Sequence, residues 1–244
     1  MVEEITVTVF PDEVNDEGKI SSLIKSEIAK KNISFKEFSK VFVKKSVDAR
    51  HGRVKVHLRY KVYIDQKPED FSFSPKWLKA DGSKVVVIVG SGPAGLFGAL
   101  KLLEAGIKPV IIERGKECGE RKKDIAAIST KQVVDENSNY CFGEGGAGTF
   151  SDGKLYTRSN KRGEVPEILK IFNYFGADEK ILTDAHPHIG TDRLPFVIKN
   201  MRNKIIEMGG EVFFGMLCTD LLLEKGDSMA EPFVSGVRCL NLES

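Results

Sequence analysis

Cysteine is scarce in this chain, and so is net charge. The four cysteines among 244 residues are Cys118, Cys141, Cys218 and Cys239, and no two of them form a C-x-x-C pair. This scattered pattern argues against an oxidised protein and is typical of a protein in a reducing compartment. The net charge of +2 is too small to indicate, by itself, binding to nucleic acid or to a membrane.

Long hydrophobic runs are also missing. No apolar stretch approaches the roughly 18 residues of a membrane-spanning helix. The first residues, MVEEITVTVF, lack the basic and then apolar segments of a signal peptide. We therefore expect a cytoplasmic protein with no membrane partner. With 41% hydrophobic and 30% charged residues, the composition is that of a globular protein able to bury a core.

The most informative part of the chain reads VVVIVGSGPAGLFGALKLLEAGIKPVIIERG. It predicts a buried strand over residues 85–89, a glycine turn, an apolar helix and a second buried strand over residues 109–112. Gly90, Gly92 and Gly95 form G-x-G-x-x-G in the strand–turn–helix setting of a dinucleotide fingerprint. Such glycines permit a tight turn, an approach by pyrophosphate and close packing of the helix, whose amino end attracts the phosphates.

A carboxylate follows the second strand where a dinucleotide site needs one. Glu113 comes 23 residues after Gly90. A spacing of about 20 residues is usual for the acid that accepts hydrogen bonds from the ribose hydroxyls. Both strands, the helix and the acid make the fingerprint far more specific than G-x-G-x-x-G alone.

The first part of the chain, residues 1–80, is predicted to be a small α+β domain. A strand is expected over residues 5–10, a helix over 17–31, and a hairpin over 41–47 and 54–64. The second hairpin strand alternates apolar residues from Val54 to Ile64 with Lys55, His57, Arg59 and Lys61. This alternation predicts an antiparallel sheet with one buried and one solvated face.

A linker with two prolines is expected over residues 65–83, with Phe71, Phe73 and Trp77 as anchors on the next domain, which spans residues 84–244. In that domain the patterns predict helices over 119–130, 165–175 and 193–208, and strands over 211–223 and 233–240 joined by a polar turn over 224–231. Asp192 or Thr191 is expected to cap the third of these helices. The predicted fold class is α/β, a Rossmann-like domain with a parallel sheet preceded by the small α+β domain.

A second glycine-rich segment, FGEGGAGTFSDGKL, occupies residues 142–155. Five glycines in fourteen residues exclude a helix, and such a loop exposes backbone N–H groups that can wrap a phosphate or a ring system. Ser151, Thr149 and Lys154 add hydrogen-bond donors. A plain surface loop is the alternative, and the position one helix after the fingerprint favours the binding role.

The two glycine motifs, Glu113-Arg114, KKSVDAR at 44–50 and HIGTDRL at 188–194 together resemble a known group. The sequence is similar to bacterial uncharacterised FAD-dependent (NAD-utilising) dehydrogenases of the glutathione-reductase-like flavoproteins, which have two dinucleotide-binding folds. The resemblance implies an FAD-dependent oxidoreductase that transfers hydride, with NAD(P)H as a possible donor and an unknown small-molecule substrate. Members of that family continue into a further glycine-rich segment that closes over the flavin, so we expect this chain to be the amino-terminal part.

The resemblance also implies a role for each matched position. Residues 90–95 would hold the FAD pyrophosphate, Glu113 the adenosine ribose, and Arg114 would lie near the adenine, whose edge would meet the backbone at Cys218. Residues 145–149 and 151–155 would lie along the ribityl and flavin groups. The cofactor-binding residues so implied are Gly90, Ser91, Gly92, Pro93, Ala94, Gly95, Glu113, Arg114, Gly145, Gly146, Ala147, Gly148, Thr149, Ser151, Asp152, Gly153, Lys154, Leu155 and Cys218.

Other residues allow alternatives. His186 and His188 could bind a metal or transfer a proton, although no acidic or cysteine partner stands at ligand spacing. Cys141 could be a redox thiol, although no resolving cysteine accompanies it. The basic face over residues 40–61 could bind RNA, although the stacking aromatics of an RNA-binding sheet are missing. No catalytic residue is assigned and no metal is expected; an RNA-interacting flavoprotein and a non-enzymatic FAD-binding scaffold remain alternatives to the oxidoreductase.

Overall fold

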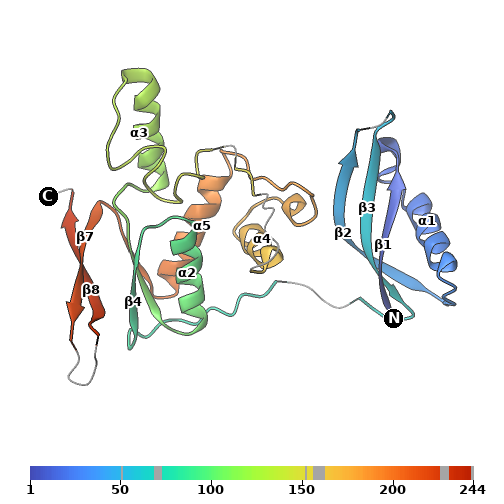
Figure 1. The fold of residues 1–244 in the computed structure, drawn as a ribbon, viewed down its shortest axis with the longest axis horizontal. Coiled ribbons are helices and arrows are strands. Elements are labelled where there is room, and N and C mark those ends of the chain that lie inside the picture. The colour runs from blue at the N-terminus through green and yellow to red at the C-terminus, as the bar shows by residue number, and fades with distance from the viewer. Residues whose placement is uncertain (51, 69–72, 152, 156–162, 226–230, 243–244) are drawn as a thin grey trace. The chain divides into compact units, whose positions relative to one another are not determined.

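A computed structural model describes residues 1–50, 52–68, 73–151, 153–155, 163–225 and 231–242. The chain forms two compact units (Figure 1). The first comprises residues 1–73, 154–174 and 178–188, and the second comprises residues 74–153, 175–177 and 189–244. The domain boundary expected near residues 80–84 stays a prediction.

The first unit contains an antiparallel sheet covered on one face by a helix, α1 (Figure 1). The strand order is β1-β3-β2, and the bounds are β1 (Val2–Val9), α1 (Glu17–Lys30), β2 (Phe38–Asp48) and β3 (Lys55–Ile64). A 3-10 turn, η1 (Pro11–Glu13), precedes α1, while α4 (Val165–Tyr174) and η2 (Glu179–Leu182) complete the unit. These elements confirm the predicted helices and the predicted hairpin, of which residue 51 lies outside the described part.

Helix α1 begins where its sequence predicts. The side chain of Asp16 accepts a hydrogen bond of 2.9 Å from the amide of Lys19, which satisfies one of the free N–H groups of the first turn. Ile20, Ile24 and Ile28 recur at helical spacing and are fully buried against the sheet. The buried face of β3, from Val56 to Ile64, forms the other half of this core, while its lysine, histidine and arginine side chains lie on the opposite face.

The second unit contains the Rossmann-like part of the chain. Its parallel sheet has the order β4-β5-β6, with β4 (Val85–Val89), β5 (Lys108–Ile112) and β6 (Glu211–Phe213). Helix α2 (Pro93–Glu104) connects the first two strands and buries Leu96, Leu100 and Leu103. Helices α3 (Cys118–Lys131) and α5 (Leu194–Glu207) follow, and a hairpin of β7 (Met216–Glu224) and β8 (Phe233–Asn241) completes the unit (Figure 1). The α/β fold class is confirmed.

Three details of the second unit differ from the sequence-based expectations. Strand β4 is present, but Val85, Val87 and Val89 are exposed, because β4 is an edge strand that pairs only with β5 among the described strands. The strand expected over residues 211–223 is two strands, β6 and β7, separated at residues 214–215. Of the polar turn expected after it, residues 226–230 lie outside the described part.

The third difference concerns the start of α5. Neither Asp192 nor Thr191 caps it, because the N-cap is Arg193, whose side chain makes no cap hydrogen bond. The carbonyl of Gly190 accepts hydrogen bonds from the amides of Arg193 and Leu194 at 2.9 and 3.0 Å, so a backbone turn satisfies them in place of a side-chain cap.

The segment before β4 is anchored to the second unit, as expected for Trp77. The indole ring of Trp77 stacks on Phe175 with centroids 5.3 Å apart, and the amide of Leu78 donates to the carbonyl of Leu103. In the first unit, Phe73 packs edge-on against Tyr174. The third expected anchor, Phe71, lies outside the described residues. Within the described part of the chain, no helix has the length and apolar character needed to cross a membrane.

Candidate functional site

The fingerprint turn leaves β4 through Gly90, whose φ of +98° is a conformation that side-chain-bearing residues rarely adopt. The amide of Gly90 donates a hydrogen bond of 2.7 Å to the carbonyl of Ile112, at the end of β5. A β-carbon on Gly95 would lie only 2.0 Å from the carbonyl oxygen of Gly90. The turn and the first turn of α2 therefore touch backbone to backbone, as a dinucleotide fingerprint requires.

Helix α2 begins with its amide groups open. Gly92 is the N-cap, Pro93 occupies the first turn, and no side chain caps this end. Pro93 and Ala94 are exposed, and a β-carbon on Gly92 would contact nothing closer than the α-carbon of Gly146, at 3.9 Å. A side-chain-free surface at the positive end of a helix dipole fits a pyrophosphate. The residues of this turn therefore fit the phosphates of a dinucleotide.

Glu113 is buried beside this turn, with 6% of its surface exposed. One oxygen, Oε2, accepts hydrogen bonds from the amide and the hydroxyl of Ser91, at 2.8 and 2.9 Å. The other, Oε1, accepts one of 2.9 Å from the amide of Gly115. A carboxylate offers about four acceptor positions, so these three bonds leave room for a ribose hydroxyl. The ribose role of Glu113 stays a prediction, and the carboxylate also fixes the backbone of the fingerprint.

Arg114 points to an aromatic neighbour. Its guanidinium lies over the ring of Phe142, 3.8 Å from the centroid, and Nη2 donates a hydrogen bond of 3.0 Å to the carbonyl of Glu136. Its buried Nε has no hydrogen-bond partner among the described residues. The proximity of Arg114 to an adenine stays a prediction.

The second glycine segment lies directly against the first. The amide of Gly145 donates a hydrogen bond of 2.9 Å to the carbonyl of Ser91. A β-carbon on Gly146 would lie 3.2 Å from Cδ of Pro93 and 3.4 Å from the α-carbon of Gly92. The structure therefore brings together two motifs that are about fifty residues apart in the sequence, at the open end of α2.

The remaining candidate residues of this loop differ in burial and in their contacts. Thr149 is buried and donates to the carbonyl of Glu144, while Ala147, Gly148 and Ser151 are exposed or partly exposed. The amide of Ile189 donates to the carbonyl of Gly153, and in the other unit the amide of Leu155 donates to that of Pro187. Lys154 forms an isolated antiparallel bridge with His188. Asp152 lies outside the described residues.

The loop is held by an arginine that the sequence patterns did not single out. Arg121, on α3, is fully buried. Its guanidinium donates to four backbone carbonyls, those of Asn139 (2.9 Å), Tyr140 (3.2 Å), Gly143 (3.2 Å) and Glu144 (2.6 Å). Burial lowers the pKa of Arg121, but arginine stays protonated in proteins. The one signal in the sequence was an arginine at an inward-facing helix position.

Glu144 is a second buried charge missed by the sequence patterns. Its Oε2 accepts a hydrogen bond of 2.8 Å from the amide of Cys118, and Arg202 lies 3.3 Å away. Its Oε1 is buried without a hydrogen-bond partner among the described residues. Burial raises the pKa of Glu144, against the opposing effects of the Cys118 amide and of Arg202. Burial also raises the pKa of the Cys118 thiol, which favours its inert neutral form.

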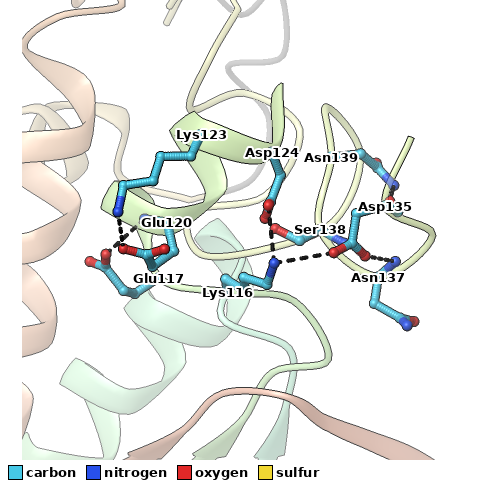
Figure 2. Close-up of polar contacts among 9 residues, drawn as sticks. All are labelled: Lys116, Glu117, Glu120, Lys123, Asp124, Asp135, Asn137, Ser138 and Asn139. Atoms are coloured by element: carbon cyan, nitrogen blue, oxygen red, sulfur yellow. Dashed lines mark hydrogen bonds and ion pairs between the residues drawn. The ribbon is translucent and has the colours of Figure 1, made fainter. Parts of the chain in front are cut away.

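Ion pairs fix the connection between the two motifs, as Figure 2 shows. Lys116 lies between two carboxylates, 3.0 Å from Asp124 and 3.2 Å from Asp135. Asp135 also accepts hydrogen bonds from the amides of Asn137 and Ser138 (Figure 2). The hydrogen bond to Asp124 is the main cause of a raised pKa of Lys116. These contacts define the course of residues 132–141 between α3 and the glycine loop.

A cavity of about 580 Å³ opens beside the glycine loop, between α3 and the amino-terminal half of α5. Tyr140, Phe150 and Phe196 supply aromatic surface, and the lining carries charges of both signs, from Lys122 and Lys199 and from Glu117 and Asp192. This size and this mixture of apolar and polar groups are typical of a small-molecule pocket.

Three other candidates, two cysteines and a histidine, lie outside the loop contacts described above. Cys218 lies on β7 opposite Cys239, partly buried, and its contact with an adenine edge stays a prediction. Cys141 is an exposed free thiol, and its redox role is untested. His186 lines a separate cavity of the first unit, described below. Within the described ranges, no group of three or more metal-ligating side chains occurs that would include His186 and His188.

Fold and site together define a Rossmann-like FAD-binding domain. The model of a family described as "FAD binding domain" matches residues 83–123, which include β4, the fingerprint, α2, β5 and Glu113. FAD is thus the cofactor of this part of the chain. Residues 1–63 match a family described as a domain of unknown function, DUF8436, which covers the sheet and α1 of the first unit.

The chain is also similar to individual proteins. An uncharacterised protein of Clostridium beijerinckii is 35% identical over 211 residues, which are 79% of this chain and 39% of that protein. The chain therefore spans less than half the length of this curated relative. The crystal structure of THI4 of Thermovibrio ammonificans aligns with a TM-score of 0.41 and 18% identity, over 66% of this chain and 48% of that one.

Proposed function

We propose that this chain forms the FAD-binding portion of a flavin-dependent oxidoreductase. The observation that supports this proposal most is the hydrogen bond from the amide of Gly145 to the carbonyl of Ser91, which joins the two glycine segments at the amino end of α2. Bound FAD supplies hydride or electron transfer, and the protein supplies binding and orientation. NAD(P)H is the proposed electron donor.

Each part of the site has a distinct task in this proposal. The open amides of α2 and the bare surface of Gly92 hold the pyrophosphate. Glu113 orients the fingerprint turn and accepts a hydrogen bond from a ribose hydroxyl. The glycine loop, kept in place by Arg121, lies along the ribityl and flavin groups. We assign the cavity between α3 and α5 to the small-molecule substrate, whose apolar body would contact Phe150 and whose negative group would face Lys122 and Lys199.

Flavin absorbance of the purified chain tests the cofactor site. Gly92→Val should abolish FAD retention, because the side chain occupies the place of the pyrophosphate. The variant should still fold, since Gly92 has a φ of −69° that valine adopts and its β-carbon meets no atom closer than 3.9 Å. Gly98→Ala is the matched control, because Gly98 lies in the same helix with open space around it. Undiminished FAD binding by Gly92→Val would disprove the site.

Reduction of the bound flavin tests the activity. Anaerobic addition of NADH or NADPH to the flavin-loaded chain should bleach the oxidised flavin spectrum, and dithionite gives the spectrum of full reduction for comparison. A flavin that dithionite reduces but that neither nicotinamide reduces would exclude NAD(P)H as the donor. A flavin that neither nicotinamide nor dithionite reduces would favour a non-enzymatic scaffold.

A further inference from the structure

On the polar face of the sheet in the first unit, cationic side chains line a hollow. The register of the strands places Thr6 and Lys44 on either side of Arg59, in one row across β1, β3 and β2. The next row places Thr8 and Ser46 on either side of His57. On the central strand, a hydroxyl and a lysine therefore flank Arg59, and two hydroxyls flank His57. All lie opposite the face that packs against α1.

A β-bulge produces this arrangement. Phe42 pairs with Tyr60 on the core face, where their rings pack with centroids 5.3 Å apart, but the following paired residue is Lys44, opposite Arg59. Val43 is the extra residue. Because side chains alternate along a strand, one additional residue changes the face to which every later side chain points. Lys44 and Ser46 thereby join the polar face.

The segment over residues 183–186 lies along this face and completes a cavity there. The amide of Lys45 donates to the carbonyl of Thr183 at 2.8 Å, and the amide of Ala185 donates to the carbonyl of Lys45 at 3.0 Å. This segment pairs with the edge of β2 and places Ala185 and His186 along the hollow. The cavity measures about 360 Å³, and Thr6, Lys44, Ser46, His57 and Arg59 complete its lining.

The charge of this cavity is positive. Lys44 on β2 is paired directly with Arg59 on β3. Two like charges in such a pair destabilise a sheet unless an anion lies nearby. Lys44 makes no ion pair within the described part of the chain, and the carboxylate of Glu4 lies 3.8 Å from Arg59 with both side chains largely exposed. Thr8 hydrogen-bonds Nδ1 of His57 at 2.9 Å and so fixes the orientation of the imidazole.

From this geometry we infer that the first unit is a binding module for the phosphate group of a small phosphorylated molecule. Lys44 and Arg59 supply the charge, and Thr6, Ser46 and His57 supply further hydrogen bonds. Charge-assisted hydrogen bonds to phosphate are the strongest that side chains form. The cavity is small, and its lining contains no phenylalanine, tyrosine or tryptophan, the large rings on which single-stranded RNA commonly stacks its bases. A small phosphorylated ligand therefore fits better than RNA does.

Calorimetric titration of the full chain tests this inference with three probes: inorganic phosphate, ribose 5-phosphate and a short single-stranded RNA. We expect saturable binding of one or both small phosphates at constant ionic strength. Tighter binding of ribose 5-phosphate would assign the cavity to a phosphorylated metabolite, and equal binding would assign it to the phosphate ion. The variant Gly92→Val should bind these probes unchanged, which separates this cavity from the FAD site.

Charge-removing variants complete the test. Lys44→Gln and Arg59→Gln should each weaken binding about tenfold or more, as the loss of a charge-assisted hydrogen bond predicts. Lys55→Gln is the matched control, because Lys55, like Arg59, lies on β3 and on the polar face, but outside the cavity. Circular dichroism checks that each variant is folded, and Ser46→Ala gives a milder change at the same place. Equal losses in all variants, or RNA binding without phosphate binding, would overturn the inference.

Discussion

Gly92 and Gly146 face each other with their α-carbons in near contact, so that a β-carbon on Gly146 would lie 3.4 Å from the α-carbon of Gly92. One glycine ends the fingerprint turn and the other belongs to the loop that follows α3. The phosphate-binding end of α2 thus has two backbone walls, and the sequence supplies a residue without a side chain on both.

Substitution of Gly146 should disturb both walls. Gly146 has a φ of +72°, and a β-carbon there would also lie 3.2 Å from Cδ of Pro93. Gly146→Ala should therefore lower the free energy of unfolding by about 1–2 kcal/mol, the cost of a left-handed conformation for alanine, and should weaken FAD retention. Urea unfolding and flavin absorbance measure the two effects. Gly98→Ala is the control, since Gly98 has open space around it and lies outside the glycine loop; equal behaviour of the two variants would contradict the assignment.

Removal of the buried guanidinium should loosen the glycine loop. Arg121→Met leaves the carbonyls of Asn139, Gly143 and Glu144 without their donor, and buried carbonyls without partners are costly. We expect the free energy of unfolding to fall by about 3 kcal/mol, with a parallel loss of FAD retention. Lys123→Met, on the exposed side of the same helix, should change stability by less than about 0.5 kcal/mol. A stable, flavin-retaining Arg121→Met would show that the loop holds its shape unaided.

The buried carboxyl of Glu144 should make stability depend on pH. Burial raises its pKa in the folded chain above the ordinary value of 4.5, so the folded state holds a proton that the unfolded chain releases. This contribution to the free energy of unfolding is present below pH 4.5 and is lost as the pH rises through the higher folded pKa. Glu144→Gln should remove that decline. Urea unfolding at a series of pH values, for both proteins, measures the difference; identical slopes would contradict the raised pKa.

Local patterns predicted the elements well, because periodicity and caps act within one turn or one strand. The isoleucines of α1 and the alternation of β3 are of this kind, and so is the fingerprint with Glu113. The sequence could not predict the exposure of Val87, because burial of a strand depends on which strands and helices lie beside it. The predicted cap of α5 was wrong, because the first amides of the helix donate to a backbone carbonyl, that of Gly190, instead of a side chain. Residue type alone does not reveal such an acceptor.

The candidate site shows the same difference between features that depend on local sequence and features that depend on distant residues. Both glycine segments were apparent from composition, whereas the contact between them requires the course of the chain through α3 and residues 132–141. Arg121 and Glu144 were missed because a buried charge is identified by its partners, which are backbone groups and residues far along the chain. Strand register likewise determines which lysines of β2 share a face, and the bulge at Val43 follows no local pattern.

The bulge at Val43 decides which residues in the second half of β2 face the core. Many residue types would fit at this position, because the sheet needs the bulge more than a particular side chain. If the same residues continued after Phe42 in unbroken alternation, Lys44 and Ser46 would point toward the layer that contains Ile24 and Leu58, and Lys45 would point to the opposite side. A relative with the same residues but a regular strand would therefore lack the cationic hollow, so identical lysines in an alignment would not by themselves indicate a shared binding surface.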